Sequence, residues 1–189
     1  EVGQPQPVTW GKCKLATASF GHGINTNLLQ LTKGYAIISN GGYDVKPTLI
    51  KKEIDVNKKT IITKATSQKI NSILRKIVVT GTAKLANVDG YEIGGKTGTA
   101  NKTINGVYTN KKINTFASVF PISKPQFVFV VLIDEPQINN SYIYEYRDGS
   151  GFKLKGAPRN TAGWTSVEVA GKIIEKIGPI LATKYIEIN

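Results

Sequence analysis

Residues 127–133, FVFVVLI, form a run of seven apolar residues, and this run constrains the fold more than any other feature of the sequence. A strand with one face in water would alternate polar and apolar residues, whereas a continuous run of this length is typical of a strand covered on both faces. We therefore predict a central strand here and expect it to be the most buried segment of the chain. Such a strand requires a layer of structure on each side of its sheet.

Three segments have the periodicity of helices that could supply those layers. Their expected N-caps are Thr26, Thr66 and Thr165, because a threonine side chain can accept a hydrogen bond from the first turn of a helix. Thr165 and Glu168 also have the spacing of a capping box. Gly178-Pro179 is expected to end or kink the last helix, since proline disrupts a helix interior.

The remaining segments indicate an antiparallel sheet and its connections. Residues 91–119 predict strands with a hairpin turn at Asn105-Gly106, and residues 43–63 predict a small hairpin. Residues 1–23 and 134–163 are rich in Gly and Pro and are expected to be loops. Helices before and after an antiparallel sheet make the predicted fold class α+β, and 189 residues suffice for a single domain.

The composition excludes some classes of function. The net charge of +12 comes from scattered lysines, without the basic face interleaved with aromatic residues that is typical of nucleic-acid binding, so we expect no nucleic-acid partner. The single cysteine, Cys13, excludes an internal disulfide and a cysteine-rich metal site, and we expect neither metal nor cofactor. The one histidine, His22, lies between two glycines and is interpreted as a turn residue rather than a catalytic base.

One short motif combines residue types that suit acyl-transfer chemistry. Lys96 offers a positive charge on a predicted strand edge, and the Thr97 and Thr99 hydroxyls can donate to the oxygens of a carboxylate. Gly98 allows a substrate backbone to approach the strand, and Gly95 keeps the approach uncrowded. A lysine, two hydroxyls and a glycine in this order therefore predict binding of an acyl substrate that carries a carboxylate.

Together with its flanking segments, this motif resembles the penicillin-binding proteins and the serine β-lactamases, which carry K-T-G on a strand and S-x-x-K and S-x-N motifs elsewhere. The pattern is similar to the class B penicillin-binding proteins associated with cell division. The matching segments are residues 19–24, 28–31, 35–42, 81–83, 94–100, 116–121, 133–136 and 161–164.

The resemblance implies that residues 1–189 are the C-terminal portion of a single transpeptidase domain, with an antiparallel sheet flanked by helices. It implies a serine-type peptidoglycan D,D-transpeptidase that binds penicillin and cross-links stem peptides during cell-wall synthesis and septation. Lys96 and Thr97 would support catalysis, and Gly95, Gly98 and Thr99 would bind the substrate. The implied partners are peptidoglycan stem peptides, β-lactams and membrane proteins of the division machinery. The implied location is the bacterial inner membrane, with an upstream anchor and the domain in the periplasm.

The sequence departs from the family pattern in one respect, because neither S-x-x-K nor S-x-N precedes Lys96. The segment from Ser150 to Lys153 spells S-x-x-K but follows Lys96 in a glycine-rich connection, so we reject Ser150 as the nucleophile. The chain also lacks methionine, even at position 1, which predicts an upstream segment that carries the nucleophile. Residues 1–189 alone are then expected to be inactive. The alternatives are a non-catalytic binding or interaction module, or a β-lactamase or D,D-carboxypeptidase of the same superfamily.

Overall fold

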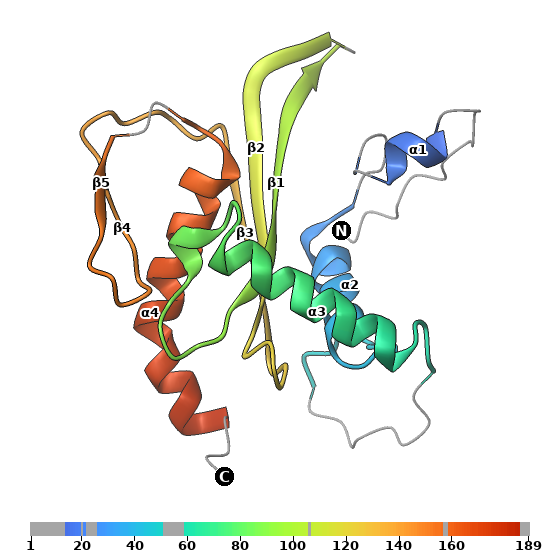
Figure 1. Cartoon of the computed structure of the whole chain (residues 1–189). Helices are drawn as coiled ribbons and strands as arrows, with labels where there is room; N and C mark the ends of the chain where they lie inside the picture. Colours follow the sequence, from blue (N-terminus) through green and yellow to red (C-terminus); the bar gives the residue numbers. More distant parts are fainter. Residues whose placement is uncertain are drawn as a thin grey trace.

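The computed structural model describes residues 14–19, 21, 26–50, 59–105, 107–156 and 159–185. Helices packed around an antiparallel sheet confirm the predicted α+β class (Figure 1). The elements, in chain order, are α1 (Lys14–Ala18), α2 (Leu28–Ser39), α3 (Lys64–Val79), the 3-10 helix η1 (Lys84–Ala86), β1 (Gly94–Ile104), β2 (Val107–Phe120), β3 (Phe127–Asp134), β4 (Ile143–Glu145), β5 (Lys153–Lys155), the 3-10 helix η2 (Ala162–Trp164) and α4 (Ser166–Tyr185).

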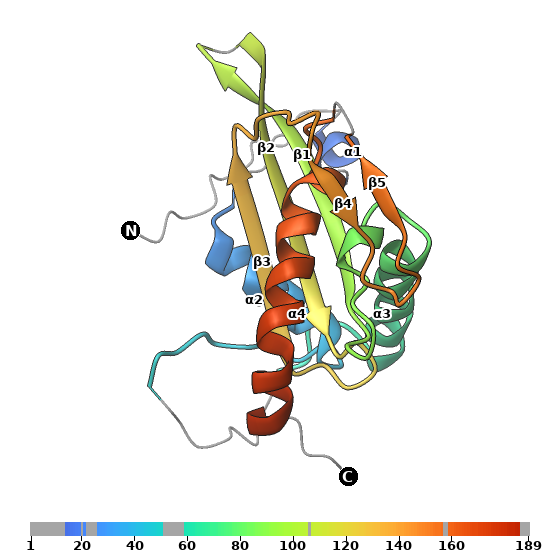
Figure 2. The same cartoon turned by 90° about the vertical axis from the view of Figure 1, so that its left-hand side faces the viewer.

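The main sheet has three antiparallel strands in the order β1-β2-β3. The predicted hairpin turn is confirmed between β1 and β2, where Asn105 has a positive φ of 51°. Helix α4 covers one face of the sheet and α2 covers the other, while α3 lies beside β1 (Figures 1 and 2). The hairpin of β1 and β2 extends beyond the helices at one end of the molecule.

The segment 127–133 forms β3, which lies at the edge of the described sheet rather than at its centre. Helices α2 and α4 cover its two faces, which explains its continuous apolar sequence. None of its residues is fully buried, whereas residues 116–120 of β2 are all buried. The prediction that 127–133 is the central and most buried strand is therefore wrong. An apolar run shows that both faces of a strand avoid water, but it does not show which strands pair with its edges.

Helices α2 and α3 begin at caps other than the predicted ones. The cap of α2 is Asn27, whose Oδ1 accepts a hydrogen bond of 2.8 Å from the Gln30 backbone, and Gln30 completes a capping box. The cap of α3 is Thr63, whose Oγ1 accepts from the Thr66 backbone. Thr26 and Thr66 each lie close to an equally suitable capping residue, so residue type alone does not select between them.

Helix α4 begins at Ser166, directly after the expected cap Thr165. The two residues of the predicted capping box have other partners, because Glu168 pairs with Arg147 and the Thr165 hydroxyl donates to the backbone oxygen of Thr161. Pro179 lies inside the helix, which continues to Tyr185. Part of the turn beyond Pro179 packs on the core through Leu181, and this contact holds the helix past the proline.

The predicted loops contain some regular structure. Residues 14–18 form the short helix α1, and residues 134–163 include β4, β5 and the start of η2, so the described parts of these segments contain regular structure that was not expected. The expected hairpin at 43–63 appears as an isolated bridge between Tyr43 and Thr60, and residues 51–58 lie outside the described part of the chain.

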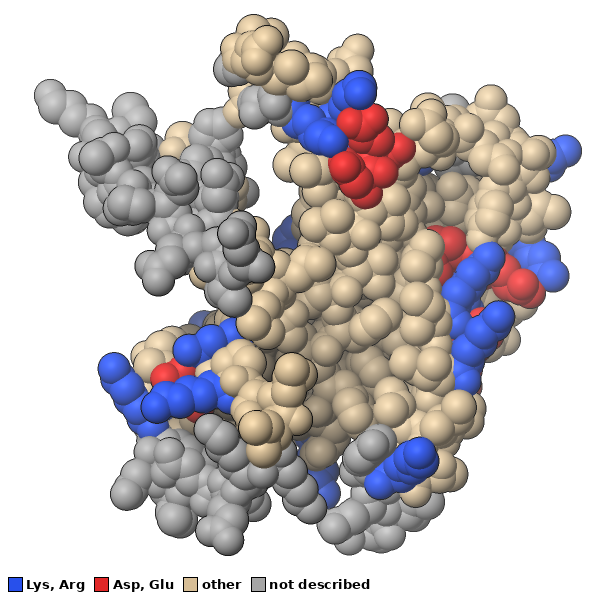
Figure 3. Space-filling model, turned by 180° about the vertical axis from the view of Figure 1, so that it is seen from behind, with Lys and Arg blue, Asp and Glu red and all other residues tan. Residues whose placement is uncertain are grey.

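The surface carries its charge in separate groups. Figure 3 shows a broad area without charged side chains, with lysines and arginines at its rim in groups that include acidic residues. One such group joins Lys102 to Asp134 and Glu135, at 3.0 and 2.9 Å. None of the described helices combines the length and the apolar character needed to cross a bilayer.

A buried ion pair between Arg147 and Glu168 attaches the β4–β5 sheet to α4. The Arg147 guanidinium contacts both carboxylate oxygens of Glu168, at 2.8 and 3.0 Å, and both side chains are about 95% buried (relative exposures 4% and 5%). Its Nη1 also donates to the backbone oxygens of Leu85 and Glu145. Burial lowers the pKa of Arg147, but its interactions with Glu168 and Glu175 together outweigh burial, so the pKa is raised. The pair therefore connects η1, β4 and α4.

Removing one partner of this pair should strongly destabilise the fold. We expect Glu168→Gln to lower the free energy of unfolding by about 3–5 kcal/mol, because Arg147 would keep a buried charge without its main partner. Urea denaturation followed by circular dichroism measures the change. The matched control is Glu145→Gln, which breaks an exposed pair with Lys153 and should cost less than about 1 kcal/mol. Equal losses in the two variants would contradict the role given to the buried pair.

Candidate functional site

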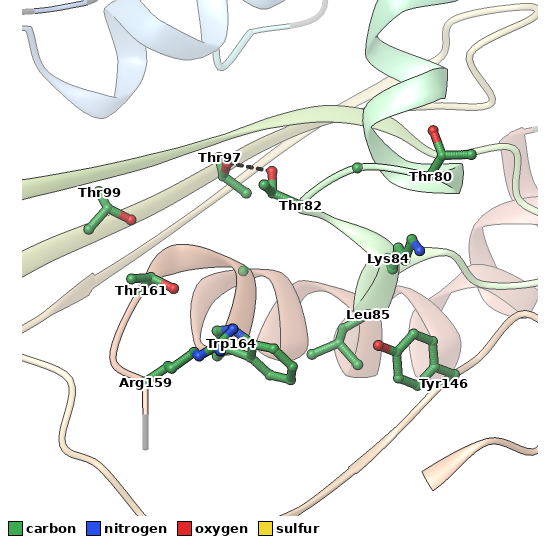
Figure 4. Close-up of a pocket in the computed structure, with 12 residues that line it drawn as sticks. Thr80, Thr82, Lys84, Leu85, Thr97, Thr99, Tyr146, Arg159, Thr161 and Trp164 are labelled. Carbon is green, nitrogen blue, oxygen red and sulfur yellow. Dashed lines mark hydrogen bonds between the residues drawn. The ribbon is translucent and has the colours of Figure 1, made fainter. Parts of the chain in front are cut away.

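A pocket of about 600 Å³ lies beside β1, between this strand, η1, η2 and the connection before η2 (Figure 4). Among the residues that the structure describes, its lining combines hydroxyls, two cations and a few apolar side chains, without an acidic residue. The lining residues are Thr80, Gly81, Thr82, Lys84, Leu85, Thr97, Thr99, Tyr146, Arg159, Thr161, Gly163 and Trp164.

The two threonines of the predicted motif both line this pocket. Alternate residues of a strand share a face, so β1 presents Thr97 and Thr99 together. The hydroxyls of Thr97 and Thr82 are 2.9 Å apart and share one hydrogen bond, which leaves the second proton of the pair for another acceptor. The Thr99 hydroxyl accepts from the Ala162 backbone at 3.0 Å, so its own proton is also available. The pocket wall can therefore donate hydrogen bonds to an anion.

The third polar residue of the motif, Lys96, does not line this pocket. Strand alternation places its side chain on the opposite side from Thr97, where it is exposed. Its ammonium donates to the backbone oxygen of Thr97 at 2.6 Å. The structure thus brings the two hydroxyls of the motif together and separates them from the ammonium.

The two glycines of the motif differ in their surroundings. A Cβ on Gly95 would lie 2.7 Å from the backbone oxygen of Ala117 and from the ring of Phe116, which is fully buried. Glycine at this position lets β1 pack directly against β2. A Cβ on Gly98 would meet nothing closer than the Thr115 side chain at 3.9 Å, so Gly98 faces open space.

Sequence reasoning missed much of the opposite wall. Arg159 carries no motif and lies in an irregular connection, and Lys84 was one lysine among many. Trp164 packs, edge to face, on Tyr144 with ring centroids 5.0 Å apart, and it also lines the pocket. The sequence offered one indication of these residues, because they lie in or near segments 81–83 and 161–164. Both segments flank the pocket.

Other candidates from the sequence lie elsewhere. Lys153 forms an exposed ion pair with Glu145 at 3.0 Å, and Ser150 accepts a backbone hydrogen bond from Phe152 within a turn. The structure shows no contact between Ser150 and Lys153. Cys13 and His22 lie outside the described residues. Among the residues that the structure describes, no three His, Cys, Asp or Glu side chains gather as a metal site would require.

Substitutions at the two glycines should separate packing from access. Gly95→Ala is expected to lower the free energy of unfolding by about 1–3 kcal/mol, because the new Cβ overlaps the Ala117 backbone and the Phe116 ring. Gly98→Ala should be neutral, or stabilising by up to about 1 kcal/mol, because it restricts the unfolded chain without a clash. Chemical denaturation of both variants tests this difference. A larger loss for Gly98→Ala would show that the space beside it is not open.

Comparisons with known proteins agree on one family. The family model of the penicillin binding protein transpeptidase domain matches residues 1–150. The probable peptidoglycan D,D-transpeptidase PenA of Neisseria flavescens is 35% identical over 135 residues, which are 70% of this chain and 34% of that protein. The probable peptidoglycan D,D-transpeptidase FtsI of Caulobacter vibrioides is 31% identical over 192 aligned positions, which cover 94% of this chain and 30% of that protein.

Solved structures show the same likeness. The transpeptidase domain of penicillin-binding protein 3 from Burkholderia pseudomallei matches with a TM-score of 0.72 and 26% identity, over 94% of this chain and 48% of that one. Penicillin-binding protein 3 from Mycobacterium tuberculosis, in complex with aztreonam, matches with a TM-score of 0.68 and 26% identity, over 90% of this chain and 39% of that one.

The chain thus spans about a third of the length of the relatives named above and no more than half of the matched structures. The family match covers 150 of its 189 residues and includes the strand that carries Thr97 and Thr99. On this evidence the chain belongs to the penicillin-binding protein transpeptidase family.

Proposed function

We propose that residues 1–189 are the C-terminal portion of a single transpeptidase domain, in a serine-type peptidoglycan D,D-transpeptidase that cross-links stem peptides during cell-wall synthesis and septation. The family membership and the names of the relatives support this proposal. The observation that carries it is the pair of hydroxyls, Thr97 and Thr99, on the side of β1 that lines a pocket of about 600 Å³.

The hydroxyl pair suits the carboxylate that ends a stem peptide and that penicillins also carry. Side chains two residues apart on a strand are about 6.8 Å from each other, so Thr97 and Thr99 can reach neighbouring atoms of one ligand. A hydrogen bond to a charged group contributes about 1.5–3 kcal/mol. The Thr82 hydroxyl orients Thr97, and the Ala162 backbone orients Thr99, so both are positioned before the ligand arrives.

The strand itself offers a second means of recognition. Within the described part of the chain, β1 pairs with β2 on one side only, and no strand covers its other edge. An extended peptide can bind such an edge through backbone hydrogen bonds. Gly98 leaves space at this point for the peptide to approach, whereas Gly95 serves mainly to hold β1 against β2. We assign substrate contacts to Gly98 and Thr99, and a supporting role to Gly95.

Lys96 and Thr97 support the chemistry without attacking the substrate. The nucleophile of the proposed reaction is a serine. Its oxygen forms a bond to the carbonyl carbon of the last peptide bond of the stem peptide, and the bond from that carbon to the nitrogen of the terminal D-alanine breaks. The proton that the serine gives up goes to the departing amine. An amine of another stem peptide then attacks the ester and loses a proton, and the serine oxygen leaves and regains one. We assign the ammonium of Lys96 to the proton network near that serine. This ammonium is exposed and lies on the side of β1 opposite to the pocket.

The nucleophile and the anchor belong to parts of the protein other than residues 1–189. The S-x-x-K segment of this chain is unsuitable, because Lys153 pairs with Glu145. We place the whole protein at the bacterial inner membrane, with this domain in the periplasm, in contact with membrane proteins of the division machinery. The likeness to FtsI proteins supports this placement.

The carboxylate role of the hydroxyls can be tested by acylation. In the full-length protein, the double variant Thr97→Val, Thr99→Val should lower the second-order rate constant for labelling by a fluorescent penicillin at least about tenfold, because it removes hydrogen bonds to a charged group. Thr109→Val, on β2 and outside the pocket, is the matched control and should leave the rate unchanged. Equal rates in the double variant and the control would refute the assignment.

The location of the nucleophile has its own test. Residues 1–189 alone should show no stable label after incubation with the fluorescent penicillin and denaturing electrophoresis, whereas the full-length protein should be labelled. A stable label on residues 1–189 would show that the serine lies within them.

A further inference from the structure

The pocket holds positive charge beyond the hydroxyl pair. Among the described residues, its charged lining residues are Lys84 of η1 and Arg159 of the connection before η2, and no Asp or Glu lines it (Figure 4). The two cations come from separate segments, and both line the one cavity. Cations that line a concave wall without acidic neighbours raise the local concentration of anions.

Arg159 is held in place by an aromatic ring rather than by an acid. Its guanidinium carbon lies 5.8 Å from the ring centroid of Trp164, within the range of a cation–π interaction. Trp164 is in turn packed on the buried Tyr144. Among the described residues no carboxylate forms an ion pair with Arg159, whereas Arg147 contacts two. Contact with the ring does not use the N–H groups of Arg159, so these donors are available for a bidentate contact with a carboxylate.

Lys84 also lacks an ion pair within the described residues. The pKa of Asp148 is lowered mainly by hydrogen bonds from Ser150 and only to a smaller extent by the charge of Lys84. Asp148 does not line the pocket. The ammonium of Lys84 therefore remains available to a ligand.

The size of the pocket exceeds what one carboxylate requires. Cavities that hold drug-sized ligands measure about 300–1,000 Å³, and this one measures about 600 Å³. The apolar side chains of Leu85, Tyr146 and Trp164 lie across the pocket from Thr97 and Thr99, on the same wall as Arg159 (Figure 4). A ligand that fits this arrangement has one carboxylate for Thr97 and Thr99, a short body with apolar surface, and a second carboxylate.

We propose that Lys84 and Arg159 form a second anion subsite, which makes this pocket selective for dicarboxylic ligands. The ligand class comprises stem peptides with a free side-chain carboxylate and β-lactams whose acyl side chain carries one. This inference rests on the proposed function, because it assumes that the first carboxylate binds at Thr97 and Thr99.

A matched pair of β-lactams tests the subsite in the full-length protein. Carbenicillin differs from benzylpenicillin by one carboxylate on the acyl side chain, so the ratio of their acylation rate constants reports on recognition of that group. We expect Arg159→Gln to lower the carbenicillin-to-benzylpenicillin ratio about tenfold, and the double variant Lys84→Gln, Arg159→Gln to lower it further. Arg159→Lys keeps the charge and should restore part of the ratio.

The control variant separates a local contact from a general change in charge. Lys155→Gln removes one exposed positive charge on β5, outside the pocket lining, and should leave the ratio unchanged. An equal fall in the Lys155→Gln variant, or an unchanged ratio in the double variant while benzylpenicillin still acylates it, would overturn the subsite and leave the proposed function intact. Failure of both β-lactams to acylate the unsubstituted protein would overturn the proposed function itself.

Discussion

Arg147 and Glu168 form an ion pair that is buried away from water, and their burial constrains the positions of the elements that contact them. A buried cation is tolerated only where its partners are fixed, because the cost of leaving it unpaired is several kcal/mol. Here the guanidinium contacts Glu168 of α4 and the backbone oxygens of Leu85 and Glu145. Leu85 and Tyr146, which precedes Arg147 in the chain, both line the pocket. The position of one pocket wall therefore depends on this pair.

The opposite wall depends on contact between two strands. Gly95 permits β1 to lie directly on Ala117 and Phe116 of β2, and the pairing of Thr97 with Phe116 continues that register. A shift by one residue would turn Lys96 and Gly98 toward the pocket in place of the two threonines. The glycine thus matters for the site through packing, although it does not itself line the pocket. The sheet positions the two hydroxyls. Lys84 is positioned by η1, where the Leu85 oxygen accepts from Arg147, and Arg159 is positioned by its contact with Trp164.

The sequence was sufficient to predict features that follow from local pattern. These were the α+β class, three helices, the turn at Asn105, and a strand that carries Thr97 and Thr99. The edge position of β3 could not be predicted, because an apolar run reports on the faces of a strand and not on its pairing. The helix starts were missed where two capping residues lie within a few positions, as Thr63 and Thr66 do.

Long-range contacts explain the remaining omissions. Glu168 has the spacing of a capping residue, yet an arginine 21 positions earlier in the chain takes its carboxylate. Arg159 and Lys84 lie in segments without periodicity, and only the folded chain brings them to one cavity. Strand alternation also places Lys96 on the side of β1 opposite to Thr97 and Thr99, which the order of residues in the motif did not show.

The two walls of the pocket also differ in how freely they could change during evolution. Thr97 and Thr99 belong to a strand whose substitution would disturb the sheet, whereas Arg159 is exposed and lies in an irregular connection. Exchanging the residue at 159 would alter the charge offered to a ligand at little thermodynamic cost. Such a division lets the shared chemistry of a lineage persist while its preference among substrates or antibiotics diverges.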